Sequence, residues 1–217
     1  MLEAVKKGDL GAVQALLAED PALAAARNEK GESAVLRAVY NGNEFILRAL
    51  LAANPPLTIH EACAAGQLER VNDLINHDPS CVREFSPDGF TPLHLAAHFG
   101  HTGVVRLLLD AHAPLETPST NEQQTVPLQA AAAGGRDEVV ALLLERGADV
   151  NSSKSPSRWT ALHLAAFSGR VEMVKVLLEA EADAGVKDVE GKTALALAVA
   201  GGRMPVIEAL RAKGVVE

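Results

Sequence analysis

The chain is 217 residues long and carries a formal net charge of −8, with 48% apolar residues but only 3% aromatic residues. The acidic balance argues against a nucleic-acid partner, because recognition of the phosphate backbone needs clustered Lys and Arg side chains. No apolar run approaches the roughly 18 residues of a transmembrane helix and MLEAVKKGDL has no apolar signal core, so we expect a cytoplasmic protein without a membrane partner.

The first half of the chain contains an internal duplication. LEAVKKGDLGAVQALLAEDP, residues 2–21, aligns without gaps on HEACAAGQLERVNDLINHDP, residues 60–79, at an offset of 58. We predict that residues 1–57 and 59–115 are two copies of one unit, whose first helix pair has no preceding loop and whose second has one. In place of that loop, the proline-stiffened residues 52–56 lead into the second copy.

Residues 88–100, DGFTPLHLAAHFG, read as a short helix with both ends marked. Thr91 is placed to cap the helix by accepting from the backbone N–H of His94, and Pro92 fills the first helical position, where a missing N–H costs nothing. Gly100 ends the helix in the left-handed conformation that glycine tolerates. Because two helical turns do not persist alone in water, this helix must stack against others like it.

Related segments recur along the chain, and the glycines that end them set a period. Spacings of 34, 35, 34 and 33 residues separate Gly66, Gly100, Gly135, Gly169 and Gly202. A second amphipathic run follows each glycine, as in VVRLLLD, VVALLLE and MVKVLLE. A period in this range indicates stacked helix pairs that share one continuous core.

Three segments resemble the ankyrin repeat: TPLHLAA at residues 91–97, GADVN at 147–151 and ALHLAA at 161–166. The resemblance extends over essentially the whole chain. It implies a single all-α domain, a solenoid of about seven helix-turn-helix repeats with short projecting loops or β-hairpins, in which the first and third repeats lack the preceding loop. The expected repeats are residues 1–27, 28–56, 57–85, 86–118, 119–152, 153–186 and 187–217.

Two of the expected loops depart from the ankyrin pattern. Residues 117–125, TPSTNEQQT, are polar and longer than the family pattern, which leaves hairpin formation open. Residues 151–158, NSSKSPSR, are rich in Ser and lack the DxxG of the family. Both segments are candidates for mobile loops.

The histidines allow a structural and a metal-binding interpretation. The resemblance gives His60, His94 and His163 a structural role, in which the imidazole bonds the backbone of the neighbouring loop. His94, His98 and His101 also suggest a metal site, because residues at i and i+4 share a helix face. No carboxylate or thiol is placed by motif to complete such a site, so we favour the structural role.

No sequence motif points to catalysis. G-x-S-x-G, GxxxxGK[ST] and HExxH are missing from the sequence. Cys63 and Cys81 form no CxxC pair, and Cys63 takes the place of a core alanine, so we expect a buried and inert thiol. We therefore predict no enzymatic activity, no cofactor and no metal.

The few aromatic residues fall at positions that the ankyrin resemblance assigns to partner contact, before the capping Thr and before the helix-ending Gly. The predicted partner-binding residues are Tyr40, Phe90, His98, Phe99, Arg158, Trp159 and Phe167. Trp159 is the strongest single candidate, since Trp and Tyr dominate interface hot spots. Ala64 and Ala65 should leave a smooth gap between Tyr40 and Phe99, and Phe45 and Phe85 are assigned to packing.

These observations favour a non-enzymatic interaction module, a monomer that binds a partner protein on its concave face. An alternative is a regulatory or immunity-type subunit that inhibits an enzyme by blocking its active site. The two functions differ in one observable, because the partner of an inhibitor loses activity on binding.

Overall fold

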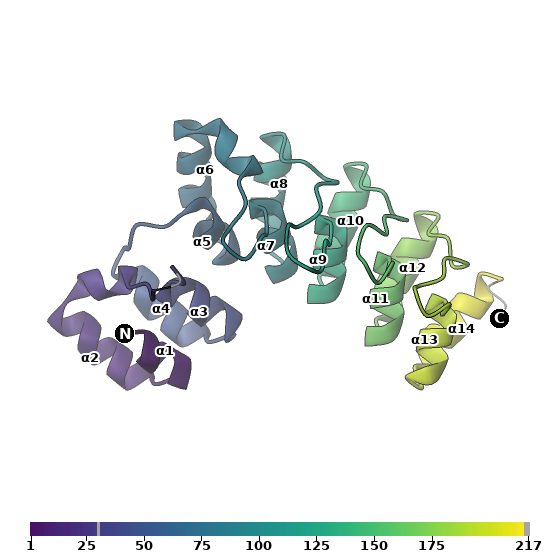
Figure 1. The fold of residues 1–217 in the computed structure, drawn as a ribbon, viewed down its shortest axis with the longest axis horizontal. Coiled ribbons are helices and arrows are strands. Elements are labelled where there is room, and N and C mark those ends of the chain that lie inside the picture. Colours follow the sequence, from purple (N-terminus) through teal and green to yellow (C-terminus); the bar gives the residue numbers. More distant parts are fainter. Residues whose placement is uncertain (30, 215–217) are drawn as a thin grey trace.

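The computed structural model describes residues 1–29 and 31–214, and its helices form an elongated stack (Figure 1). In the described part of the chain there are fourteen α-helices, two 3₁₀ helices and one isolated antiparallel bridge, between Arg27 and Ser33. The all-α solenoid predicted from the sequence is confirmed. The last three residues of the expected repeat 187–217 lie outside the described residues.

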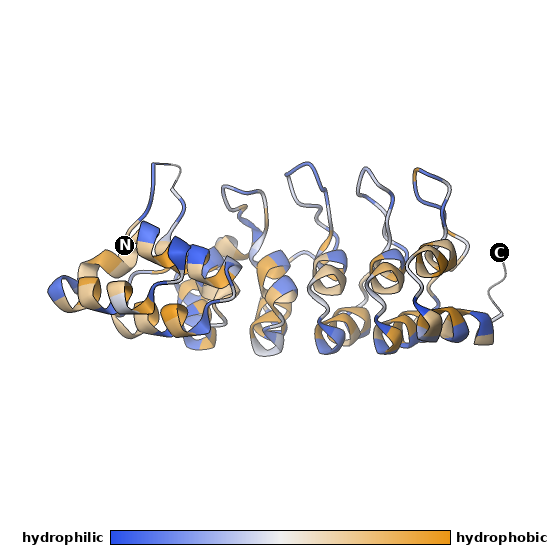
Figure 2. Ribbon diagram, turned by 90° about the horizontal axis from the view of Figure 1, so that it is seen from below, coloured by the Kyte–Doolittle hydropathy of each residue, from blue (hydrophilic) through white to orange (hydrophobic). Residues whose placement is uncertain are grey.

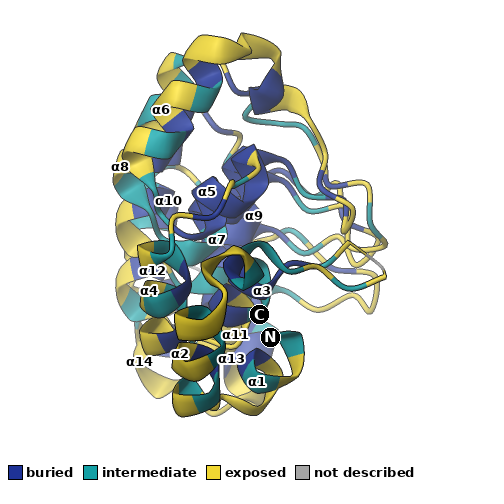
Figure 3. Cartoon of the chain, turned by 90° about the vertical axis from the view of Figure 1, so that its left-hand side faces the viewer, coloured by how far each residue is buried: buried dark blue, intermediate teal, exposed yellow. Residues whose placement is uncertain are grey.

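The helices alternate between an inner row, next to the projecting loops, and an outer row (Figure 3). The inner row comprises α1 (Leu2–Lys7), α3 (Ala34–Tyr40), α5 (Ile59–Ala64), α7 (Pro92–Phe99), α9 (Pro127–Gly134), α11 (Ala161–Ser168) and α13 (Ala194–Ala200). The outer row comprises α2 (Leu10–Glu19), α4 (Glu44–Ala52), α6 (Leu68–His77), α8 (Thr102–Asp110), α10 (Asp137–Glu145), α12 (Val171–Glu179) and α14 (Met204–Ala212). The mostly hydrophilic loops project from one side of the stack (Figure 2).

The helix bounds repeat at the predicted offset of 58 residues. The offset relates α2 to α6 and α4 to α8 at both ends, and it also relates the 3₁₀ helices η1 (Pro21–Ala25) and η2 (Pro79–Arg83). Asp20 and Asp78 cap these 3₁₀ helices alike, each accepting at 2.9 Å from the backbone N–H two residues on. Residues 54–58 run from α4 to α5 without a hairpin, as predicted, and Arg70 Nη1 donates to Pro55 O at 3.0 Å.

The buried apolar residues form two clusters. One spans α1 to α4 and extends into the neighbouring repeats through Ala64, Ala65 and Leu95. The other runs from Ile59 on α5 to Leu210 on α14 and consists mainly of Ala, Val and Leu. Figure 1 shows the corresponding arrangement, in which α1 to α4 lie beside the row formed by the later helices rather than in line with it.

His94 ties its helix to the next loop. Its Nδ1 accepts from the backbone N–H of Thr91 at 3.3 Å and lies 2.7 Å from the Thr91 hydroxyl. Because a backbone N–H can only donate, Nδ1 is unprotonated, and the remaining Nε2–H donates to Thr125 O at 2.7 Å. The Thr91 side chain and the backbone N–H of His94 also form the predicted cap, as one half of a capping box whose other half is the imidazole. Burial lowers the pKa of His94 to about 4.

The same brace recurs in other repeats, as the resemblance implied. His60 Nε2 lies 3.1 Å from Glu84 O, and His163 Nε2 lies 3.3 Å from Lys192 O. Gln129 takes the equivalent place on α9, where its amide donates to the backbone carbonyl of Trp159. A side-chain N–H donor at this position is therefore shared by α5, α7, α9 and α11, whereas α3 and α13 have Leu36 and Ala196 there.

A second set of braces follows the helix-ending glycines. Arg136 Nε donates to His98 O at 2.9 Å, Arg170 Nη1 to Gly135 O at 3.3 Å and Arg203 Nε to Phe167 O at 3.2 Å. Each arginine thus satisfies a carbonyl at the C-terminal end of the preceding inner helix. The sequence carries a signal for this role that our prediction did not use, since each arginine directly follows a helix-ending Gly.

Candidate partner-binding surface

Tyr40, His98 and Phe99 come together at the N-terminal end of the candidate surface. The ring centroids of Tyr40 and Phe99 lie 5.6 Å apart, and those of His98 and Phe99 lie 5.0 Å apart, both edge to face. Tyr40 also donates its hydroxyl to Asp88 Oδ2 at 2.7 Å. Burial and the Asp88 carboxylate raise the pKa of Tyr40, so the phenol keeps its proton and joins α3 to the loop that precedes α7.

The smooth gap expected between Tyr40 and Phe99 is therefore wrong. Ala64 and Ala65 are 1% and 8% exposed, because the rings on α3 and α7 meet over the short helix α5 and leave its alanines covered. The gap in the aromatic row lies further along, on α9, where the exposed residue is Ala133. Alanine at this place leaves room between the Tyr40 and Trp159 ends of the surface.

Trp159 and Phe167 form the other end of the surface, with ring centroids 5.4 Å apart. The indole of Trp159 also stacks on the imidazole of His163, and its Nε1–H donates to Asp188 Oδ2 at 3.1 Å. The indole is half-buried and is part of the packing of its repeat. Arg158 beside it is exposed and has a φ of 58°, at the turn position that Gly89 occupies two repeats earlier.

The exposure of the aromatic residues differs in part from the predictions. Tyr40 is 46% and Phe167 53% exposed, whereas Phe90 and Phe99 are half-buried and pack on the N-terminal core cluster. His98 is half-buried too, and its Nδ1 lies 3.3 Å from Ala130 O. The assignment of Phe45 and Phe85 to packing is wrong, because their side chains are 71% and 42% exposed.

Two hollows connect the aromatic ends. One of about 230 Å³ is lined by Tyr40, Phe90, His98 and Gln123, and one of about 400 Å³ is lined by Gln123, Ala133, Trp159 and Leu164 among others. Both hollows share Gln123, Thr125, Gln129 and Ala133. They therefore form one continuous trough along the inner helices, from Tyr40 to Trp159, with Phe167 at its far rim.

The projecting loops, which we call fingers, are residues 27–29 with 31–33, and residues 86–90, 119–125, 155–159 and 188–192. Backbone hydrogen bonds close most of them, such as Ser86 N to Phe90 O at 2.8 Å and Ser119 N to Thr125 O at 2.8 Å. The last bond closes the loop whose hairpin the sequence left open. In the Ser-rich loop, Arg158 N donates to Ser155 O at 2.9 Å. Both atypical loops are thus internally hydrogen-bonded turns.

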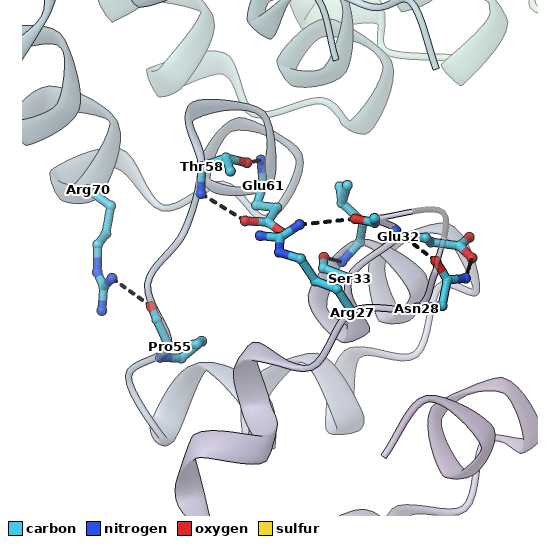
Figure 4. A network of polar contacts seen from close by, with 10 residues as sticks. Arg27, Asn28, Glu32, Ser33, Pro55, Thr58, Glu61 and Arg70 are labelled. Atoms are coloured by element: carbon cyan, nitrogen blue, oxygen red, sulfur yellow. Dashed lines mark hydrogen bonds and ion pairs between the residues drawn. The ribbon is translucent and has the colours of Figure 1, made fainter. Parts of the chain in front are cut away.

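An ion pair between the exposed guanidinium of Arg27 and a buried carboxylate joins the first copy of the duplicated unit to the second (Figure 4). Glu61 is 1% exposed, and its carboxylate lies 2.7 Å from Arg27 Nη2 while it accepts from Thr58 N at 2.8 Å in a capping box. Asn28 and Glu32 close the adjoining finger through a side-chain hydrogen bond of 2.9 Å. Sequence reasoning did not identify this pair, since its two residues are separated by a whole repeat.

The histidines considered as metal ligands and the cysteines considered as nucleophiles lie at structural positions. The rings of His94, His98 and His101 contact three different backbone carbonyls, of Thr125, Ala130 and Ala64, so they do not converge on one point. Cys63 is buried as predicted, Cys81 is buried too, and burial raises the pKa of both thiols. Within residues 1–29 and 31–214, no helix is both long and apolar enough to span a bilayer.

Comparison with known proteins identifies the repeats. A family model described as ankyrin repeats (3 copies) matches residues 59–154 and 152–216, well over half of the chain. The chain belongs to the ankyrin-repeat family. Ankyrin repeats are in general non-enzymatic protein–protein interaction modules. Residues 1–58 lie outside the matched segments, although their helix bounds repeat those of the matched second copy.

The curated relatives are much longer than the part they share with this ankyrin-repeat chain. Ankyrin repeat and SAM domain-containing protein 6 of Mus musculus is 35% identical over 106 residues, which cover 49% of this chain and 12% of the relative. Ankyrin repeat and SOCS box protein 3 of Homo sapiens is 35% identical over 142 residues, which cover 60% of this chain and 27% of the relative. A Transient receptor potential cation channel subfamily A member 1 homolog of Caenorhabditis elegans is 33% identical over 140 residues, 64% of this chain and 11% of the relative.

Proposed function

We propose that this chain is a scaffold or adaptor module that binds a partner protein along the trough from Tyr40 to Phe167. The observation that carries the proposal is the placement of the aromatic residues. The sequence contains seven Phe, Trp and Tyr residues in all, and five of them, Tyr40, Phe90, Phe99, Trp159 and Phe167, lie at the two ends of this one trough. Exposed aromatic rings next to a trough are typical of interaction sites.

The rigidity of the surface supports the proposal. Tyr40 is held by its hydrogen bond to Asp88, and Trp159 by its hydrogen bond to Asp188. Side chains that are fixed before binding lose little conformational entropy when a partner arrives, so more of the contact energy appears as affinity. Tyr40 and Phe167 present the largest exposed fractions and are the expected anchors. Trp159 and the exposed Arg158 complete the Phe167 end.

Phe167 is a cleaner test of binding than Trp159. Removing the Trp159 indole also removes its bond to Asp188 and its stacking on His163, so we expect Trp159→Ala to lower stability as well as affinity. The ring of Phe167 is 53% exposed, so its removal should leave stability within about 1 kcal/mol. Phe45, 71% exposed on the outer helix α4, provides a matched aromatic control away from the trough.

The test is capture of partners from an extract of the cells that make this chain. We expect the unmodified chain and Phe45→Ala to retain the same protein, and a Tyr40→Ala/Phe167→Ala variant to bind it at least thirtyfold more weakly, since hot-spot rings contribute about 2 kcal/mol or more. Melting temperatures confirm that all variants are folded. Equal binding by the three proteins would refute the trough as the binding site.

A further inference from the structure

The fingers are coupled to one another in pairs, and the coupling depends on one sequence position. Thr120 N donates to Gly89 O at 2.9 Å, and Val189 N donates to Ser157 O at 3.2 Å. These bonds join finger 119–125 to finger 86–90, and finger 188–192 to finger 155–159. Both donors directly follow the first residue of their finger. A backbone N–H at this position therefore joins each of these two fingers to the one before it.

The other two of these four fingers carry proline at that position. Fingers 86–90 and 155–159 read SPDGF and SPSRW, so Pro87 and Pro156 stand where Thr120 and Val189 stand in their neighbours. Proline has no backbone N–H, so neither finger is able to donate a hydrogen bond from this position. The bond between fingers is therefore missing in front of both Ser-Pro fingers, and the first of them also follows the repeat of α5, which has no finger.

A hollow lies at each place where this bond is missing. The first, of about 550 Å³, has Leu36, Tyr40, His60 and Pro87 among its lining residues. It lies where the repeat of α5 has no finger. The second is the 400 Å³ hollow described above, with Pro156, Trp159 and Leu164 in its lining. Each hollow therefore combines a proline, an aromatic ring and a leucine. We call them the Tyr40 hollow and the Trp159 hollow.

The charged groups of the Tyr40 hollow are paired within the chain. Arg27 contacts Glu61 and Arg37 contacts Glu32. Asp88 accepts from the hydroxyls of both Tyr40 and Ser86. An incoming charged side chain would have to break one of these pairs, so an uncharged apolar side chain fits this hollow better.

From these features we propose that the two hollows are paired subsites for one extended, proline-containing segment of the partner protein. The inference rests on the proposed function and specifies its ligand. Addition of a β-strand is disfavoured, because Pro87 and Pro156 remove backbone donors from the walls that such a strand would meet. A polyproline II segment needs no ladder of backbone bonds, and aromatic-lined grooves recognise it through its side chains.

The spacing of the hollows sets the spacing of the anchors. The Tyr40 hollow is lined by residues of α3 and α5, and the Trp159 hollow by residues of α9 and α11. These positions are three inner-helix spacings apart, and neighbouring helices pack at 8–10 Å, so the hollows are about 27 Å apart. A polyproline II chain rises about 3.1 Å per residue, so two anchoring side chains should be separated by about nine residues. The exposed Ala133 lines the Trp159 hollow and also the 230 Å³ hollow that connects it to Tyr40, so the side chain on the path of the segment is small.

Calorimetric titration with synthetic peptides tests the proposal. The probe is a capped proline-rich peptide with two Leu-Pro pairs about nine residues apart, and its controls carry the pairs about four residues apart or replace them with Gly-Ser. We expect the nine-residue spacing to bind at least tenfold more tightly than either control. Fluorescence of Trp159, the only Trp in the chain, should change on binding.

Amino-acid substitutions test whether the peptide binds in the two hollows. Tyr40→Ala in one hollow and Ala133→Glu on the path should each weaken peptide binding at least tenfold, while Tyr40→Phe and Phe45→Ala retain it. Equal affinity for the three peptides, or unchanged binding by Tyr40→Ala and Ala133→Glu, would overturn the paired hollows. If the captured partner is still lost in Tyr40→Ala/Phe167→Ala, the proposed function stands and only this inference fails.

Discussion

The outer helices and the 3₁₀ helices of the two copies share their bounds, but the inner helices differ in burial. All six residues of α5 are buried, whereas Val5 is the one buried residue of the equivalent helix α1. α5 is stacked between α3 and α7, and α1 packs on α3 along the stack. Burial in this chain is thus decided by the neighbours in the stack, while the helix bounds are decided by local sequence.

The same comparison explains why equivalent residues have different roles. Glu61 is buried against Arg27 of the preceding repeat, whereas its counterpart Glu3 is exposed. Phe85, the counterpart of Arg27, is 42% exposed. The second copy has become dependent on the first through this ion pair. Stability should therefore respond unequally to matched substitutions in the two copies.

The largest expected effect is that of Arg27→Ala. It leaves the buried carboxylate of Glu61 without its cation. Loss of one partner of a fully buried pair costs about 3–5 kcal/mol, and because the guanidinium of Arg27 is 39% exposed we expect about 2–3 kcal/mol. Phe85→Ala, the matched change in the second copy, should cost less than about 1 kcal/mol. Urea unfolding measures both. Adding Glu61→Gln to Arg27→Ala should recover part of the loss, and equal losses for Arg27→Ala and Phe85→Ala would contradict the role of the pair.

A smaller effect is expected from His94. His94→Ala leaves Thr125 O and Thr91 N without their partner, which should cost about 1–3 kcal/mol of unfolding free energy. His94→Gln should retain most of the stability, because Gln129 performs the same function in the next repeat. The thermal denaturation of the two variants compares them directly. If the glutamine variant is as unstable as the alanine variant, the donor role of this position is wrong.

The last effect concerns pH. The first copy contains no histidine, whereas burial lowers the pKa of His94 in the second copy to about 4 from about 6.5. Between these values the unfolded chain binds the extra proton, so the contribution of His94 is complete above pH 6.5 and declines as the pH falls toward 4. His94→Gln should therefore flatten the loss of stability on acidification, by up to about 1.4 kcal/mol per pH unit. Urea unfolding at pH 7 and pH 5 tests this, and equal pH dependence of the two proteins would refute it.

The sequence predicted the features that depend on local chemistry. Caps and helix-ending glycines repeat with a period. The solenoid, the 58-residue duplication and the braces at His60, His94 and His163 could therefore be predicted from the sequence.

Features that depend on contacts between neighbouring repeats could not be predicted from the sequence. The Arg27–Glu61 pair, the exposure of Phe45 and Phe85 and the contact of Tyr40 with Phe99 each depend on how far one helix pair overlaps the next. The overlap between neighbouring helix pairs depends on the repeat of α5, which is short and has no finger. The period of the sequence does not specify this overlap.

Hydrogen exchange of the complex with the captured partner reports where the partner lies on the chain. We expect slower amide exchange in fingers 86–90, 119–125 and 155–159 and in the exposed turns of α7, α9 and α11. Exchange in the outer helices α6, α8 and α10 should be unchanged. Protection confined to those outer helices would refute binding in the trough and place the binding site on the opposite face.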